Sequence, residues 1–116
     1  MWDESMIGLR ALLTGLLLAS GAVATCGAAN APSMAVNWVE VTDDQDACVQ
    51  QASNALKKNN FGTAFSVINN RTLYGERGAY TAAVRCVAEK AIAFVAVAGP
   101  GSDLTEKYAD AIKNGF

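Results

Sequence analysis

Residues 80–98, YTAAVRCVAEKAIAFVAVA, decide most of the fold that this sequence predicts. Residues 80–88 alternate as a half-covered β-strand does, with Tyr80, Ala82, Val84 and Cys86 on one face and Thr81, Ala83, Arg85 and Val87 on the other. Residues 91–98 are apolar on both faces, which is typical of a strand that is central or covered on both sides. Glu89 and Lys90 lie between the two runs, so the stretch predicts two strands joined by a short turn.

Two more segments on the N-terminal side have strand patterns. Residues 35–41 alternate β-branched and aromatic residues with other residues, which predicts a first strand. Residues 64–77 predict a second strand, with residues 69–71 as a bend or bulge inside it. Gly75 and Gly78 then mark a tight hairpin that leads into the strand at residue 80.

The first predicted helix follows residue 41. Thr42 can cap the amide of Gln45, with Gln45 reaching back, and the nearby aspartates suit the positive end of a helix dipole. Residues 59–62, Asn-Asn-Phe-Gly, end the helix. Its apolar stripe has helical spacing and consists of Cys48, Ala52, Ala55 and Leu56.

The second predicted helix closes the chain. Either Ser102 or Asp103 caps its start, and Gly115 ends it. The stripe expected to face inward consists of Leu104, Tyr108, Ala111 and Ile112.

These elements follow the order β-α-β-β-β-α over residues 35–116, after a short exposed lead-in at residues 30–34. We expect one small α+β domain in which two helices cover one face of a mostly antiparallel sheet. The pattern leaves the order of the strands open.

Residues 1–29 have the layout of a secretory signal peptide. Arg10 precedes the apolar run ALLTGLLLASGAVA, and small residues follow it. Cleavage after Ala24 or Ala29 fits the small-x-small pattern. Because Asp3 and Glu4 do not suit a basic leader, Met6 is a second candidate for the first residue.

Two alternatives to a cleaved leader stay open. The uncharged stretch is long enough for a retained membrane anchor, which needs about 20 apolar residues. Cys26 is a candidate for lipid modification at the N-terminus of a processed chain, although Thr25 departs from the small residue usual before such a cysteine. The membrane is a partner only if the N-terminal segment is kept.

Cleavage after Ala29 would leave Cys48 and Cys86 as the cysteines of the mature chain. An even pair in a small exported domain predicts a disulfide, and the periodicity turns both residues inward. The alternative is two separate buried thiols that pack as small hydrophobic residues. The spacing includes no Cys-x-x-Cys motif, which argues against a redox function.

Composition excludes several kinds of function. The 116 residues include nine Lys and Arg, eleven Asp and Glu, and no histidine. Catalytic arrangements that need histidine and metal sites that need imidazole are therefore excluded, and the slight negative charge does not favour nucleic acid as a partner. Asp43, Asp44 and Asp46 are explained by helix capping, so we expect no metal and no cofactor.

The candidate binding surface combines arginines and tyrosines in and near the predicted hairpin. Arginine with aromatic residues on a sheet can bind phosphate, carboxylate or single-stranded nucleic acid, of which nucleic acid is disfavoured for an exported, slightly acidic protein. The exposed aromatic residues of a sheet with one uncovered face also favour a protein partner, with a second copy of the chain as one candidate. The residues of this candidate surface are Arg71, Tyr74, Arg77, Tyr80 and Arg85.

We therefore expect an exported protein of the periplasm or cell exterior that is not an enzyme and that binds another protein or an envelope component. The competing hypothesis is a small ligand-binding or hydrolase-like protein that uses Glu40 and the hairpin arginines. A deep pocket near Trp38 and Glu40 would favour the competing hypothesis, and a flat open sheet face would favour the first. A membrane-anchored subunit is the third hypothesis if the N-terminus is retained.

Overall fold

The computed structural model describes residues 31–116, which contain one antiparallel sheet and two α-helices. The strands are β1 (Ser33–Glu40), β2 (Thr63–Ile68), β3 (Thr72–Arg77), β4 (Tyr80–Val87) and β5 (Ile92–Gly99). They lie in the order β1-β5-β4-β3-β2, with every neighbouring pair antiparallel. The predicted signal peptide, the alternative start at Met6 and the lipidation candidate Cys26 lie outside the described residues.

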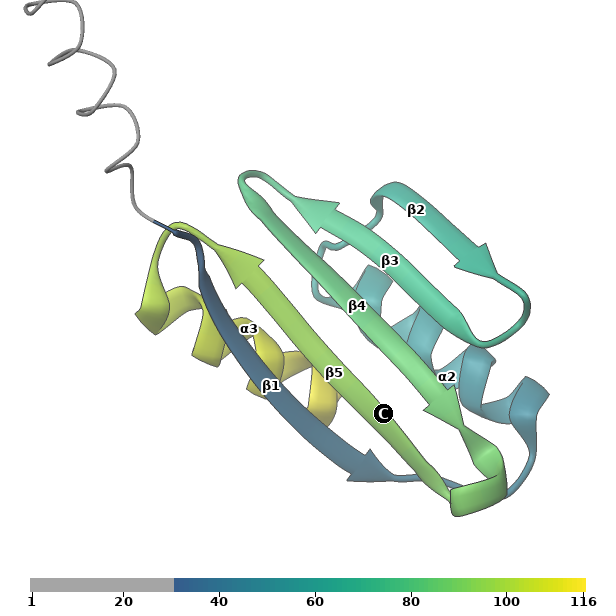
Figure 1. Ribbon diagram of the computed structural model, residues 1–116. Helices are drawn as coiled ribbons and strands as arrows, with labels where there is room; N and C mark the ends of the chain where they lie inside the picture. The colour runs from purple at the N-terminus through teal and green to yellow at the C-terminus, as the bar shows by residue number, and fades with distance from the viewer. Residues whose placement is uncertain (1–30) are drawn as a thin grey trace, which may run out of the picture. The chain divides into compact units, whose positions relative to one another are not determined.

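Both helices pack on the same face of the sheet. In Figure 1, α2 (Gln45–Lys58) and α3 (Ser102–Asn114) lie behind the strands, with α2 across β3 and β4 and α3 across β1 and β5. The predicted α+β class, with its two helices on one face, is therefore confirmed. The strand predicted over residues 91–98 is present as β5 (Ile92–Gly99) inside the sheet, but no described element covers its second face.

The predicted strand over residues 64–77 is wrong, because the chain reverses direction in the middle of it. Asn69 and Asn70 adopt φ values of 55° and 51°, and the N–H of Arg71 donates to the carbonyl of Ile68 at 3.1 Å. Asparagine tolerates this left-handed conformation, and two such residues form the kind of turn that joins adjacent antiparallel strands. The domain order is consequently β-α-β-β-β-β-α.

The two other connections in the meander lie where they were predicted, although Gly75 is paired inside β3 and only Gly78 lies in the hairpin turn. Arg77 pairs with Tyr80 across a two-residue turn in which Gly78 has a φ of 58°. Glycine reaches this positive φ without the steric cost of a Cβ atom. Ala88–Lys90 forms the short turn between β4 and β5 as one turn of 3₁₀ helix, closed by Ala91 in the left-handed conformation.

Helix α2 begins later than predicted. Asp44, not Thr42, is the N-cap, and its side chain accepts a hydrogen bond from the N–H of Ala47 at 3.2 Å. Gln45 has a different function from the one predicted. Its amide nitrogen donates to the carbonyls of Asn70 and Cys86, and its oxygen accepts from the N–H of Ala88, so one side chain joins the helix to two connections of the sheet.

Helix α3 differs from its prediction at the cap and in its buried face. Gly101 is the N-cap, so neither Ser102 nor Asp103 caps this helix. The buried residues are Thr105, Ala109 and Ile112, whereas Leu104 keeps 38% of its surface exposed. Thr105 can be buried because its hydroxyl donates to the carbonyl of Ser102 at 2.8 Å, which satisfies the polar group.

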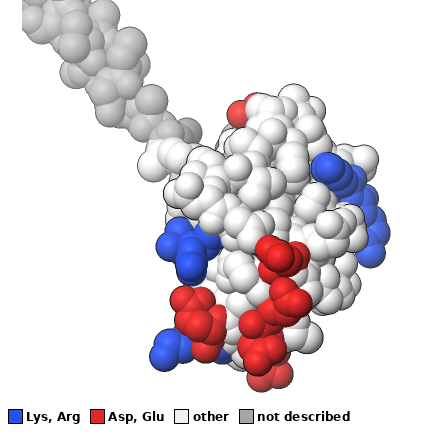
Figure 2. Space-filling view, turned by 90° about the vertical axis from the view of Figure 1, so that its right-hand side faces the viewer, with Lys and Arg blue, Asp and Glu red and all other residues white. Residues whose placement is uncertain are grey.

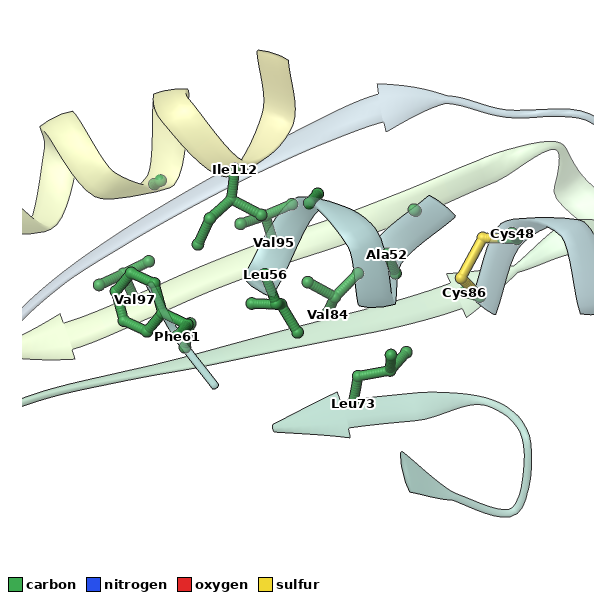
Figure 3. Packing of buried hydrophobic residues seen from close by; sticks show 14 residues of the cluster. Cys48, Ala52, Leu56, Phe61, Leu73, Val84, Cys86, Val95, Val97 and Ile112 are labelled. Carbon is green, nitrogen blue, oxygen red and sulfur yellow. A yellow bond between two sulfur atoms is a disulfide. The ribbon is translucent and has the colours of Figure 1, made fainter. Parts of the chain in front are cut away.

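The core lies between the helices and the sheet. The predicted stripe of α2 is fully buried, and Figure 3 shows it facing the inward residues of β3, β4 and β5. Small residues permit close approach: a Cβ atom at Gly115 would lie 3.2 Å from that of Ala55, and one at Gly99 would clash with the ring of Tyr80. The core residues that α2, the following loop and the sheet contribute include Ala52, Leu56, Phe61, Leu73, Val84, Val95 and Val97.

The predicted disulfide is present. Cys48 in the first turn of α2 is bonded to Cys86 on β4, with their Cα atoms 6.0 Å apart and 38 positions apart in sequence (Figure 3). Both cysteines have no exposed surface. The bond therefore fixes the start of α2 to the middle of the sheet.

Replacing both cysteines, as Cys48→Ala with Cys86→Ala, should lower the free energy of unfolding by about 4 kcal/mol, because a loop of this length restricts the unfolded chain by that amount. Urea unfolding of the oxidised wild type and of the double variant would measure the difference. The reduced wild type is the control, since it loses the crosslink but keeps both side chains. A difference below about 1 kcal/mol would contradict this account of the disulfide.

Candidate binding surface

The side of the sheet that faces away from α2 and α3, here called the open face, carries most of the exposed apolar side chains. Six of the eight exposed large hydrophobic residues in the described part of the chain lie on it. Large apolar residues that remain exposed together commonly mark an interaction site. The six, with their exposed fractions, are Met34 (68%), Val36 (65%), Trp38 (51%), Ile68 (48%), Phe94 (45%) and Tyr74 (39%).

Strand register aligns these side chains in rows across the open face. One row runs from β1 to β2 through Trp38, Phe94, Arg85, Thr72 and Ile68. The next row runs through Val36, Ala96, Ala83, Tyr74 and Ser66. Because the two central positions of the second row are alanines, the open face has a low centre between the larger side chains of β1 and β3.

Three of the five predicted surface residues come together on the open face or at its border. Arg71, Tyr74 and Arg85 line a depression of about 340 Å³ near the turn between β2 and β3. Arg85 donates from Nη1 to the hydroxyl of Thr72 at 2.9 Å, which holds its guanidinium beside β3. The depression offers charge-assisted hydrogen bonds to an acidic group of a ligand.

Arg71 is also engaged with a carboxylate. Its Nη1 atom lies 3.5 Å from Oε2 of Glu89, and both side chains are partly exposed. A backbone hydrogen bond lowers the pKa of Glu89 below its ordinary value, and the positive charge of Arg71 lowers it further. Exposed ion pairs of this kind contribute little to stability, so Arg71 remains able to exchange this partner for another anion.

The other two predicted surface residues lie on the opposite face, beneath the helices. The guanidinium carbon of Arg77 stands 4.4 Å from the ring centre of Tyr108, and Nη1 donates to the carbonyl of Asn59 at 3.2 Å. Tyr80 packs edge-on against Tyr108, and its hydroxyl accepts from the N–H of Gly101 at 3.1 Å. The alternation of β4 already grouped Tyr80 with Cys86, so this signal was present in the sequence.

The region near Trp38 and Glu40 is a depression of about 290 Å³ at the end of β1. Lys90, Ala91 and Ile92 contribute to its lining, and the side chains of Trp38 and Glu40 are themselves exposed. The site is open to solvent and does not enclose a ligand. The region near Trp38 and Glu40 is therefore not the deep pocket that the ligand-binding or hydrolase-like hypothesis requires.

Two aspartates at the start of α2 have local structural functions. In Figure 2, acidic side chains gather towards the lower end of the molecule, the end at which α2 begins in Figure 1. There Asp44 caps α2 and Asp46 accepts a hydrogen bond from Asn70 at 2.6 Å. Within residues 31–116 no group of three or more cysteine, aspartate or glutamate residues is arranged to hold a metal ion. In the same range, no helix is long and apolar enough to cross a membrane.

Sequence reasoning missed several residues of the open face. Met34 was assigned to the lead-in, but β1 begins at Ser33 and includes it. Phe94 belongs to a segment that is apolar on both faces, and this pattern also fits a strand that is covered on both sides. The sequence therefore did not indicate that Phe94 is exposed. Val36 and Ile68 could have been found from strand parity once the buried face was known.

No protein-family model, curated protein or solved structure matches this chain.

Arg77 and Arg85 provide a direct test of the two faces. Arg77→Ala should lower the free energy of unfolding by about 1–2 kcal/mol, because the variant loses a cation–π contact and leaves the carbonyl of Asn59 without this donor. Arg85→Ala should change it by no more than about 0.5 kcal/mol, as most exposed substitutions do. Urea unfolding of both variants measures the difference. Equal effects would contradict the assignment of these arginines to different faces.

Proposed function

We propose that this chain is an exported, disulfide-linked protein without catalytic activity, and that it binds another protein or an envelope component through the open face. The observation that carries the proposal is the concentration of exposed apolar side chains on one side of the sheet, from Met34 and Trp38 on β1 to Tyr74 on β3. Charged or polar residues usually occupy the solvated side of such a sheet.

The size of the open face supports a macromolecular partner. The five strands have six or eight residues each, and at about 3.4 Å per residue and about 4.8 Å between strands they cover on the order of 600 Å² in projection. A standard protein–protein interface buries about 800 Å² on each partner. The relief of the side chains adds to the projected area, so the face is large enough for a stable contact.

The composition of the open face also fits a protein partner. Trp38, Phe94 and Tyr74 provide aromatic side chains, which are enriched at interfaces, and Arg85 provides a charge-assisted donor between them. A partner with apolar side chains and a carboxylate placed over Arg85 would match this arrangement. A second copy of the chain is a candidate partner, since Glu76 on the same face carries a carboxylate.

The absence of catalysis is proposed from the surroundings of the acidic residues. Glu40, Glu76 and Glu89 are all exposed. Acid–base catalysts generally lie in partly enclosed sites in which neighbouring groups tune their protonation. The hydrolase-like hypothesis needs such a site beside Glu40, and the depression there is open.

Site-specific crosslinking tests the open face. A photoreactive benzoylphenylalanine in place of Phe94 should give crosslinked adducts when the protein is made in its native host and irradiated. The matched control is the same substitution at Leu104, which is exposed on α3 at 38%. Adducts at both positions in equal yield, or at position 104 alone, would refute binding through the open face. An adduct of twice the subunit mass would identify a second copy as the partner.

Export is tested by the intact mass of the protein from its native host, measured with and without reduction and thiol alkylation. We expect a chain that begins near Thr25 or Asn30, with Cys48 and Cys86 accessible to alkylation only after reduction. The buried disulfide supports this expectation, because such bonds persist in oxidising compartments. A full-length mass with free thiols would refute both export and the disulfide.

A further inference from the structure

The two edges of the sheet differ in how well they resist pairing with another strand. At the β2 edge the register shifts between Thr63 and Ser66, and Ala64 has a φ of 52°. Such irregularities disrupt the regular pattern that an incoming strand would need. At the other edge, β1 pairs with β5 in unbroken register over eight residues, from Ser33 to Glu40. Strand β1 contains neither proline nor lysine, the residues that commonly protect an edge.

The backbone of β1 presents hydrogen-bonding groups along its outer side. The N–H of Val41 donates to the carbonyl of Ala91 at 3.0 Å, so odd-numbered residues of this strand direct their backbone groups towards β5. The N–H and C=O groups of Met34 and Val36 therefore point away from β5. Trp38 agrees with this parity, because its N–H donates to the side chain of Asn37 at 2.9 Å and not to β5.

A groove follows the same edge. It has a volume of about 390 Å³ and is lined by residues 34–37 of β1 and by Glu106, Ala109 and Asp110 of α3. We call it the edge groove. Asn37 joins the strand and helix sides of this groove, since its amide nitrogen donates to Oδ1 of Asp110 at 2.6 Å. An exposed strand beside a helix is the arrangement in which extended peptides bind by adding a strand to a sheet.

The charges of the edge groove select among possible occupants. Two carboxylates and no basic residue lie among the described residues that line it. A second copy paired through β1 would bring Glu106 and Asp110 of both copies towards one junction, which like-charge repulsion disfavours. An extended segment with basic side chains would instead be attracted.

We propose that the edge groove binds an extended peptide segment of another protein, in which apolar and basic residues alternate, as an additional strand beside β1. The side chains opposite Met34 and Val36 lie on the open face and are apolar. The intervening side chains point towards α3 and are lysine or arginine, which meet Glu106 and Asp110. The peptide would share Met34 and Val36 with the open face, but the inference does not rest on the proposed function, because its premises are the outward backbone groups of β1 and the charges of α3.

The test uses the full chain and a fluorescent, end-blocked hexapeptide that alternates valine and lysine, with binding followed by fluorescence anisotropy. A peptide with glutamate in place of lysine is the control. We expect the lysine peptide to bind at least about tenfold more tightly than the glutamate peptide, and increasing salt to weaken it. Equal binding of the two peptides, or binding of neither, would overturn the proposal.

Two substitutions separate the backbone from the side chain at the same position. Val36→Pro removes an N–H that points away from β5, so the variant keeps every hydrogen bond to β5. Proline is tolerated at edge positions of this kind. It should abolish binding of the lysine peptide, whereas Val36→Ala, which keeps the N–H, should weaken it by no more than about threefold. Circular dichroism verifies that both variants are folded. If folded Val36→Pro binds the peptide as the wild type does, strand addition at β1 is refuted.

Charge reversal tests the second element of the groove. Glu106→Lys should weaken binding of the lysine peptide and strengthen binding of the glutamate peptide. The matched control is Asp43→Lys in the exposed loop before α2, which should leave both unchanged because Asp43 lies in neither the edge groove nor the open face. Sedimentation of the protein alone tests the other possible occupant, a second copy of the chain. A dimer that Val36→Pro dissociates would show that a second copy pairs through β1, which would overturn the proposal of a basic peptide. Crosslinking from position 94 is a separate readout, so failure of the two proposals can be told apart.

Discussion

The close contact between α2 and the sheet is the constraint on which the rest of this structure depends. Alanine at positions 52 and 55 lets the helix approach the strands, and the Cys48–Cys86 bond makes the contact covalent at its first turn. Gln45 also joins the start of α2 to the turn before β3, to Cys86 on β4 and to the turn after β4. With α2 fixed in this way, Gly115 allows α3 to end against Ala55, and the two helices cover one face of the sheet together.

Covering one face with both helices has a consequence for the other. A five-stranded sheet in a chain of this size has no further helix in residues 31–116 to protect its second side. The sequence does not make that side uniformly polar: Trp38, Phe94 and Tyr74 remain exposed there beside polar residues such as Arg85, and two alanines lie at the centre. The same architecture leaves β1 as a regular outer strand beside the acidic flank of α3. Two different surfaces, one made by side chains and one by backbone groups, thus arise from one arrangement of layers.

Local periodicity predicted the parts of the fold that local physics controls. The sequence predicted the apolar stripe of α2, the alternation of β4 and the turn at Gly78. Helix pitch and strand pleat impose fixed residue spacings, and a positive φ favours glycine. The reversal at Asn69 and Asn70 was mistaken for a bend, since whether a chain turns back depends on the strand that it then pairs with. The predicted buried face of α3 was displaced by one residue, because the face that a helix buries depends on the elements it packs against, here β1 and β5.

The sequence by itself determined the class of the fold, the inward placement of both cysteines and the exclusion of histidine-based chemistry. Each follows from composition or from short-range spacing. Only the tertiary structure decided the strand order, which aligned Trp38 with Phe94 and Arg85 in one row and placed β1 at an outer edge. The tertiary structure also placed Arg85 and Arg77 on opposite faces of the sheet. The sequence did not separate them, because the face of each strand that the helices cover was not known. Pairing between strands is a long-range interaction, and a pattern of alternating residues specifies which side chains share a face but not which strands are neighbours.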